Sequence, residues 1–333
     1  MHIAVIGAGS WGTTLADLLA RNGHDVRLWA YEQEVVESIN RYHVNALFLA
    51  ESRLAESLKA YRELSDTAAG AELVVSAVPS HAVREVMTQL AAILAGRRMP
   101  LMATVSKGLE ESTLNTMTDV LGEIFPDAQI AALSGPSFAQ EVYARHPTAV
   151  VAASSTPEAS SAVQQVFSTS HFRVYTSADP LGVQLGGALK NVIAIAAGLL
   201  HGLRLGHNTL AALMTRGLAE LTRLGQAMGA NPMTFAGLAG MGDLILTATG
   251  ALSRNRALGI ELAEGRSLEQ ILAGRRTVAE GVRTARAAVE LSQRAGVELP
   301  IAQEVANILF AGKHPDEAVR HLMDRELKAE HWR

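Results

Sequence analysis

The 333-residue chain is long enough to form two domains and to bury a sizeable hydrophobic core. Its formal net charge of −4 supplies no basic surface for nucleic acid or for an anionic membrane, so we expect neither as a partner. The chain has no cysteine, which excludes disulfides, thiolate metal sites and a cysteine nucleophile. The N-terminal segment lacks the basic stretch and apolar run of a signal peptide, and we expect a cytoplasmic protein.

Short apolar runs in the first half of the chain, most of them bounded by Gly, Pro, Ser or Asp, are predicted strands. In chain order they cover residues 2–7, 25–30, 72–78, 101–106, 130–135, 148–154 and 172–177. Between them, residues 13–23 and 82–94 carry apolar side chains at the three- and four-residue spacing of an amphipathic helix. This alternation predicts an α/β fold with a mostly parallel sheet covered on both faces.

The pattern changes near Asp179-Pro180. Beyond this point there is no convincing strand, and long helical stretches are separated by glycine-containing turns. We therefore predict an α/β domain over residues 1–178 and an all-helical domain over residues 179–333. The broad apolar faces of the helical half suit the pairing of two copies, and we expect a homodimer.

A glycine-rich segment follows the first predicted strand. Gly7, Gly9 and Gly12 form the pattern G-x-G-x-x-G, with an apolar strand before it and an amphipathic helix after it. In that setting Gly7 makes the tight turn, Gly9 lets the backbone approach a pyrophosphate, and Gly12 lets the helix pack against the strand. The free N–H groups at the helix start then face the phosphates. The first domain is therefore predicted to be a Rossmann-type domain that binds NAD or NADP.

The residues after the second predicted strand bear on the choice between these two cofactors. Glu32 stands at about the distance beyond Gly12 at which an acid binds the ribose 2′-OH of NAD. The same residue equally suits a solvated position at the start of the next helix. No arginine in this segment is placed to receive the 2′-phosphate of NADP, so NADH is slightly favoured over NADPH.

Lys190 is the one charged residue in the apolar segment 182–198. An unpaired ammonium group in an apolar setting is costly, or it loses its proton. The lysine is therefore either paired with another group or placed there for chemistry. Burial is expected to lower the pKa of Lys190 toward neutrality, which suits a group that transfers protons.

Other polar residues stand where ligands bind in α/β folds. Lys107 follows the strand 101–106 and is a candidate for a charge aimed into the cleft, although a lone loop lysine also suits the surface. Ser137 lies in a segment that nearly matches the nucleophile elbow of hydrolases, a function that would leave the glycine fingerprint unexplained. Asp243 follows a glycine-rich turn and suits a helix N-cap, a functional carboxylate, or both.

The segment Ser253-Arg254-Asn255-Arg256 predicts an anion site. Ser253 suits an N-cap, yet two arginines stand in the first turn, where the helix dipole favours acids. A phosphate would be held there by backbone N–H groups, the serine hydroxyl and a guanidinium, whereas the alternative is two solvated arginines. The eleven histidines show no ligand spacing, so no metal is predicted.

Taken together, these segments resemble the NAD(P)-dependent glycerol-3-phosphate dehydrogenases of the soluble bacterial type. The resemblance covers essentially the whole chain and rests on GAGSWGTTLA, VPSHAVREV, SKGLE, SGPSFAQE, FRVYTS, GVQLGGALKNVIAIAAG, TRGLAE, GLAGMGDLILT, SRNR and VAEG. It implies reduction of dihydroxyacetone phosphate, a triose phosphate, to sn-glycerol 3-phosphate for glycerophospholipid synthesis. Relatives often carry His or Arg where this chain has Tyr31-Glu32, a departure that bears on NADPH use.

The resemblance also assigns roles to residues. It implies that Lys190 is the catalytic lysine, and we expect it to be the proton donor or acceptor. As a mechanism, we expect that Asp243 orients Lys190 and that Lys107 polarises the carbonyl. Substrate contacts are implied for Lys107, Gly135, Ser137, Lys190, Asn191, Asp243, Thr247, Ser253, Arg254 and Asn255. Cofactor contacts, the fingerprint glycines included, are implied for Gly7, Gly9, Ser10, Trp11, Gly12, Tyr31, Lys107, Ala139, Arg254, Val278 and Glu280.

Two other classes of function stay open from the residues alone. A related β-hydroxyacid-type dehydrogenase would use Arg254 and Lys107 for another small anionic substrate. A nucleotide-sensing protein without activity would use only the fingerprint and would need neither Lys190 nor Asp243. A panel of substrates distinguishes the first alternative from a glycerol-3-phosphate dehydrogenase. An assay of NADH oxidation distinguishes the second alternative, which has no activity, from an enzyme.

Overall fold

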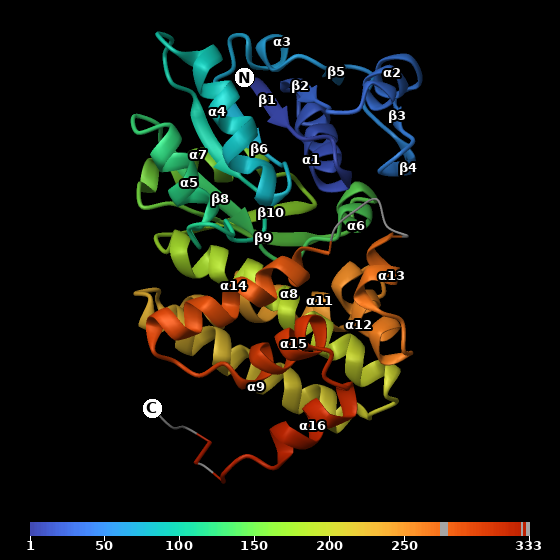
Figure 1. The fold of residues 1–333 in the computed structure, drawn as a ribbon. Coiled ribbons are helices and arrows are strands. Elements are labelled where there is room, and N and C mark those ends of the chain that lie inside the picture. The colour runs from blue at the N-terminus through green and yellow to red at the C-terminus, as the bar shows by residue number, and fades with distance from the viewer. Residues whose placement is uncertain (274–278, 328, 331–333) are drawn as a thin grey trace. The chain divides into compact units, whose positions relative to one another are not determined.

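The structure is a computed structural model that describes residues 1–273, 279–327, 329 and 330 (Figure 1). The chain forms two compact units. Unit 1 comprises Met1–Gly187 with Gly229–Asp243, and unit 2 comprises Ala188–Met228 with Leu244–Arg333. The boundary between domains at residues 178 and 179 stays a prediction.

Unit 1 is built on an eight-stranded sheet in the order β10-β9-β8-β7-β6-β1-β2-β5. Its strands are β1 (His2–Ile6), β2 (Asp25–Trp29), β5 (Lys59–Tyr61), β6 (Leu73–Ser76), β7 (Leu101–Thr104), β8 (Ile130–Ser134), β9 (Thr148–Ala153) and β10 (Phe172–Ser177). All neighbours are parallel except β8 and β9. The prediction of a mostly parallel sheet is confirmed, and the succession β5-β2-β1-β6-β7-β8 is the strand order of dinucleotide-binding domains.

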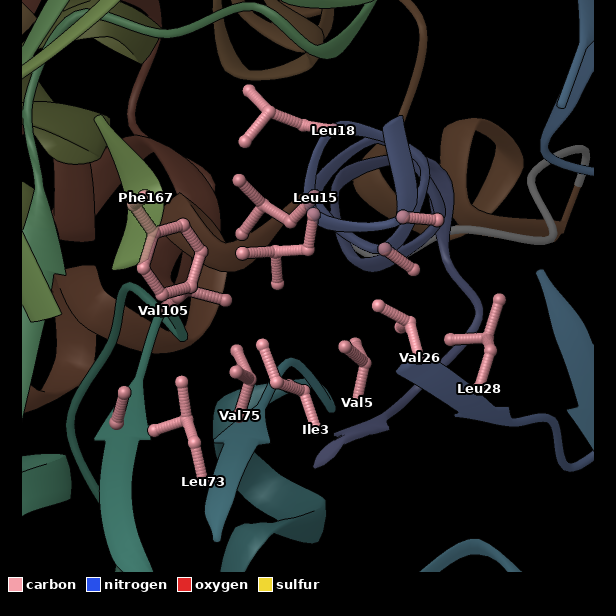
Figure 2. Close-up of a cluster of buried hydrophobic side chains, with 14 of the residues drawn as sticks. Ile3, Val5, Leu15, Leu18, Val26, Leu28, Leu73, Val75, Val105 and Phe167 are labelled. Carbon is pink, nitrogen blue, oxygen red and sulfur yellow. The ribbon is translucent and has the colours of Figure 1, made fainter. Parts of the chain in front are cut away.

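Helices cover both faces of this sheet (Figure 1). Ile3 and Val5 of β1 point to one face and pack with α1 (Ser10–Arg21) and α7 (Pro157–Phe167), as Figure 2 shows. The alternate residues of β1 pack on the other face with the helices α3 (Leu64–Ala68), α4 (Val83–Leu94) and α5 (Met117–Ile124). Because both faces of the sheet are buried, the strands are nearly continuous apolar segments in the sequence.

Shorter elements complete unit 1. They are α2 (Gln33–Tyr42), η1 (Ser80–Ala82), α6 (Ala139–Tyr143), α10 (Pro232–Phe235), the π-helix η2 (Leu238–Gly242) and an antiparallel pair, β3 (Val44–Asn45) with β4 (Leu49–Arg53). The sequence did not predict β3, β4 or β5. The strand β5 has only three residues, too few to show a strand period. All three pair with β2, from Lys59 opposite Arg27 to Tyr61 opposite Trp29.

Unit 2 is helical, and no strand occurs among the described residues beyond β10. Its helices are α9 (His207–Ala227), α12 (Arg254–Ala263), α13 (Leu268–Ala273), α14 (Glu280–Ala295), α15 (Pro300–Ala311) and α16 (Pro315–Met323). Two further helices, α8 (Pro180–Gly202) and α11 (Asp243–Thr249), begin in unit 1 and end in unit 2. The predicted order of an α/β domain followed by a helical domain is confirmed.

The helix α8 is long and apolar enough to cross a membrane, yet its most apolar stretch is entirely buried inside the protein. Small residues let a neighbouring helix of unit 2 come close to it. A Cβ atom on Gly198 of α8 would overlap the carbonyl oxygen of Arg256, and one on Gly259 of α12 would overlap that of Ile195. The backbones of α8 and α12 are therefore in direct contact, which larger residues at these two positions would prevent.

Replacing Gly259 by Ala is expected to destabilise the protein. The added methyl group would meet backbone atoms of α8, which cannot rotate away, and such overpacking costs about 1–3 kcal/mol or more. The matched control is Gly122→Ala in α5, where the nearest atom to a new Cβ is Ile130 Cδ1 at 3.9 Å. Because alanine favours helix by about 1 kcal/mol over glycine, this control should be neutral or stabilising. Thermal unfolding compares the two variants, and equal midpoints would contradict the close packing.

Candidate active site

The parallel strands of unit 1 bring several predicted site residues to one edge of the sheet. Gly7 follows β1, Tyr31 follows β2, Lys107 follows β7 and Gly135 follows β8. The carboxyl ends of parallel strands lie together, and α/β folds bind their ligands at this edge. The N–H of Gly7 donates to the carbonyl oxygen of Trp29 at 3.1 Å, which ties the fingerprint loop to the end of β2.

Two of the three fingerprint glycines, Gly7 and Gly12, stand where a side chain would collide with the backbone. Gly7 has φ +120°, and a Cβ there would lie 2.8 Å from the backbone of Ala77. A Cβ on Gly12 would overlap the carbonyl oxygen of Gly7, so α1 packs directly against the loop. A Cβ on Gly9, in contrast, would find no atom within 4 Å, so the space beside it is open. The loop is thus tightly packed on one side and open at Gly9.

The start of α1 fits a dinucleotide phosphate. Gly9 is its N-cap residue, no side chain caps the helix, and no acid stands in its first turn. The N–H groups of Ser10 and Trp11 precede the first bond of the helix, which Thr13 N donates to Gly9 O. The indole N–H of Trp11 is buried and has no partner within the described part of the chain. Such a helix start suits an anionic pyrophosphate.

A charged cluster lies at the ends of β7 and β8. Lys107 Nζ is 2.7 Å from Asp243 Oδ2 and donates to the carbonyl oxygen of Gly135 at 2.8 Å. The hydroxyl of Ser137 donates to the same carbonyl oxygen at 3.0 Å. The Asp243 side chain is 1% exposed and that of Lys107 is 19% exposed, so the two charges are paired largely away from water. Unit 1 therefore brings together four of the predicted substrate residues.

The prediction that Asp243 is an N-cap is wrong. An N-cap residue has extended backbone angles, whereas Asp243 has φ −72° and ψ −31° and continues directly from η2 into α11. Its carboxylate accepts from Lys107. The alternative left open by the sequence, a functional carboxylate, is the one that this geometry favours.

A second polar cluster lies in unit 2, on α8, α11 and α12. Lys190 is 6% exposed, and its ammonium donates to the hydroxyl of Thr247 at 2.6 Å. The next residue, Asn191, accepts from the side-chain amide of Asn255 at 2.9 Å. Asn255 in turn accepts from the N–H of Gly281 at 3.0 Å, which ties the start of α14 to α12. Lys190 is therefore a buried charge held by a polar partner.

The remaining site residues lie at helix starts. Ser253 is the N-cap of α12 and accepts from Arg256 N at 3.2 Å, which confirms the predicted cap, and the exposed Arg254 begins the helix. Glu280 begins α14, whereas Val278 lies outside the described residues. Ala139 begins α6 and accepts from the hydroxyl of Thr14 on α1 at 3.3 Å.

One residue near the predicted cofactor site was missed by sequence reasoning. The guanidinium of Arg62 lies 4.8 Å from the ring centroid of Tyr31. The segment after β2 itself carries no arginine, but β5 pairs with β2 and brings Arg62 beside Tyr31. No signal in the sequence could have located it, since β5 itself is too short to predict. Glu32 is the N-cap residue of α2, and its side chain does not cap the helix.

The strand order, the fingerprint loop and the following helical unit define a dinucleotide-binding protein of the two-domain dehydrogenase class. Two family models match the chain: the N-terminal part of NAD-dependent glycerol-3-phosphate dehydrogenase over residues 2–160 and its C-terminal part over residues 179–320. The chain belongs to this family.

Individual relatives agree with that assignment. The chain is 54% identical to a glycerol-3-phosphate dehydrogenase (NAD(P)+) of Geobacter sulfurreducens, over 99% of both proteins. It is 52% identical to an enzyme of the same name from Myxococcus xanthus, again over 99% of both. Among solved structures, glycerol-3-phosphate dehydrogenase from Coxiella burnetii superposes with a TM-score of 0.92 at 38% identity, covering 97% of this chain and 98% of that one. The yeast enzyme gives a TM-score of 0.81 at 26% identity, covering 97% and 99%.

Removing the charge of Asp243 should destabilise the protein. Asp243→Asn leaves the largely buried ammonium of Lys107 without its counter-ion, and a hydrogen bond to a charged group contributes about 1.5–3 kcal/mol. The matched control is Glu56→Gln, which breaks an ion pair to Arg53 whose side chains are both largely exposed. This control should unfold at the wild-type temperature. Thermal unfolding of both variants is the measurement, and an unchanged midpoint for Asp243→Asn would show that the pair is not stabilising.

Proposed function

We propose how this enzyme carries out the NAD(P)H-dependent reduction of dihydroxyacetone phosphate to sn-glycerol 3-phosphate, and the reverse reaction. When the nicotinamide is bound, it supplies the hydride that reduces the ketone carbon. The alkoxide that forms needs a proton, the carbonyl oxygen needs a positive charge beside it, and the phosphate needs an anchor. Three groups of residues in this chain are suited to these three tasks.

Lys190 moves the proton. This assignment rests on the burial of Lys190, which is 6% exposed in a helix with no other Lys and no Arg, Asp or Glu. Its ammonium donates to the hydroxyl of Thr247. The hydroxyl of Thr247 fixes the position of Nζ, so that little reorganisation is needed when the proton moves. In the reverse reaction the neutral amine accepts the proton from the hydroxyl of glycerol 3-phosphate.

Lys107 polarises the carbonyl. Its ammonium has three N–H bonds, and two of them are directed to Asp243 and to the carbonyl oxygen of Gly135. The third can donate to the substrate oxygen on which negative charge develops. Asp243 accepts from Lys107 and orients it. The role of Asp243 in orienting Lys190 stays a prediction.

Arg254 anchors the phosphate at the start of α12. The first turn of this helix has no acid, and the buried Ser253 caps it. Asn255 holds this helix start against Asn191, the residue after Lys190. A guanidinium together with backbone N–H groups binds phosphate strongly, and this binding positions the reacting carbon.

The proposal extends to the setting of the enzyme. Its product is the phosphorylated glycerol from which glycerophospholipids are built, and we assign the enzyme to that synthesis in the cytoplasm. Exposed apolar side chains of the helical unit, among them Leu205, Ile245 and Phe310, suit a homodimer.

Lys190→Ala should abolish turnover while leaving NADH binding nearly intact, because the substitution removes the proton donor and leaves the fingerprint loop unchanged. General acid–base catalysis contributes about 10²- to 10⁴-fold, so kcat should fall by at least a hundredfold. Oxidation of NADH at 340 nm reports turnover, and quenching of protein fluorescence reports binding. Lys59→Ala on β5 is the control and should keep wild-type activity. A Lys190→Ala enzyme that keeps its turnover would refute the assignment.

A further inference from the structure

Arg62 and Tyr31 form a stacked pair at the edge of the sheet where the cofactor is expected. The Arg62 guanidinium lies 4.8 Å from the Tyr31 ring centroid, and Tyr31 is 67% exposed. Arg62 is itself exposed, and its guanidinium makes no ion pair or hydrogen bond within the described part of the chain. The contact of the guanidinium with the ring face is a cation–π interaction, which favours this position of the cation.

The backbone fixes this pair beside the fingerprint. The indole N–H of Trp29 donates to the carbonyl oxygen of Arg62 at 2.8 Å, and Ala30 N donates to the carbonyl oxygen of Tyr61 at 3.0 Å. On the other side of β2, Gly7 N donates to Trp29 O. The fingerprint loop, Tyr31 and Arg62 therefore follow three adjacent strands, β1, β2 and β5.

This placement has a chemical consequence. A dinucleotide whose pyrophosphate lies at the start of α1 has its adenosine ribose near the end of β2. An acid there binds the ribose 2′-OH, and an arginine there accommodates a 2′-phosphate. Glu32 follows Tyr31 and Glu63 follows Arg62. The segments after β2 and β5 therefore carry negative charge as well as the positive charge of Arg62. Arg62, over the face of Tyr31, is placed to meet such a 2′-phosphate.

We propose that Arg62, stacked on Tyr31, binds the 2′-phosphate of NADPH and that this enzyme uses NADPH at least as well as NADH. The inference rests on the proposed function and adds a residue that selects the cofactor. It also reverses the preference for NADH drawn from Tyr31-Glu32, because that preference considered only residues adjacent in sequence.

The first test is binding, measured by calorimetry with two fragments of the cofactor, adenosine 2′,5′-bisphosphate and adenosine 5′-monophosphate. The wild-type protein should bind the bisphosphate at least tenfold more tightly. In Arg62→Ala the affinity for the bisphosphate should fall about tenfold to a hundredfold, the range of a charge-assisted hydrogen bond, and the affinity for the monophosphate should stay within threefold. Arg62→Lys should recover part of the affinity, because it keeps the charge without the planar fork.

Arg41→Ala is the matched control. Arg41 stacks on Tyr42 at 5.4 Å, in the same way as Arg62 on Tyr31, but it lies in the last turn of α2, about 12 Å along the helix from its start. This variant should bind both fragments like the wild type. Equal affinity of the wild type for both fragments, or an equal loss for both in Arg62→Ala, would overturn the proposal.

The second test is activity with the two coenzymes. Arg62→Ala should lower kcat/KM for NADPH about tenfold to a hundredfold and leave kcat/KM for NADH within about threefold. An unchanged ratio of the two values would overturn the role of Arg62 while leaving the reaction itself established. If neither coenzyme reduces dihydroxyacetone phosphate, the proposed function fails, and the fragment affinities still decide whether Arg62 binds a 2′-phosphate.

Discussion

The contact between the backbones of α8 and α12 is the constraint on which unit 2 depends. Gly198 and Gly259 permit it, because a Cβ on either residue would overlap a carbonyl oxygen of the facing helix. Because the two backbones are so close, the side-chain amide of Asn255 donates a hydrogen bond to Asn191. Asn255 also accepts from the N–H of Gly281 at the start of α14. The glycines at this contact therefore let α12 come close enough to α8 for the buried side-chain amides of Asn191 and Asn255 to form a hydrogen bond.

Lys107 in unit 1 and Lys190 in unit 2 each have a side-chain partner for the ammonium group. Lys107 faces a carboxylate, Asp243, and the attraction between opposite charges offsets the cost of removing both from water. Lys190 donates to the neutral hydroxyl of Thr247. Each ammonium group is therefore held in place by a side-chain partner.

Structure could be predicted from the sequence where it depends on residues that are close together in the chain. The strands of the parallel sheet, the fingerprint loop and the Ser253 cap could be predicted because each has a short-range signature of apolar runs, glycine spacing or a capping hydroxyl. The pairing of Lys107 with Asp243 could not, since these residues are 136 positions apart and meet only through the fold. Arg62 was missed for the same reason: a three-residue strand with a lysine and a tyrosine shows no period, and pairing with β2 alone places it.

If the start of α12 holds a phosphate, the benefit of Arg254 must depend on the phosphate of the substrate. The direct measurement is kcat/KM of the wild type and of Arg254→Ala with dihydroxyacetone phosphate and with phosphate-free dihydroxyacetone, with Arg256→Ala as the neighbouring control. We expect Arg254→Ala to lose about tenfold to a hundredfold with the phosphorylated substrate and less than threefold with the other. Equal losses with both substrates would contradict a phosphate site at this helix.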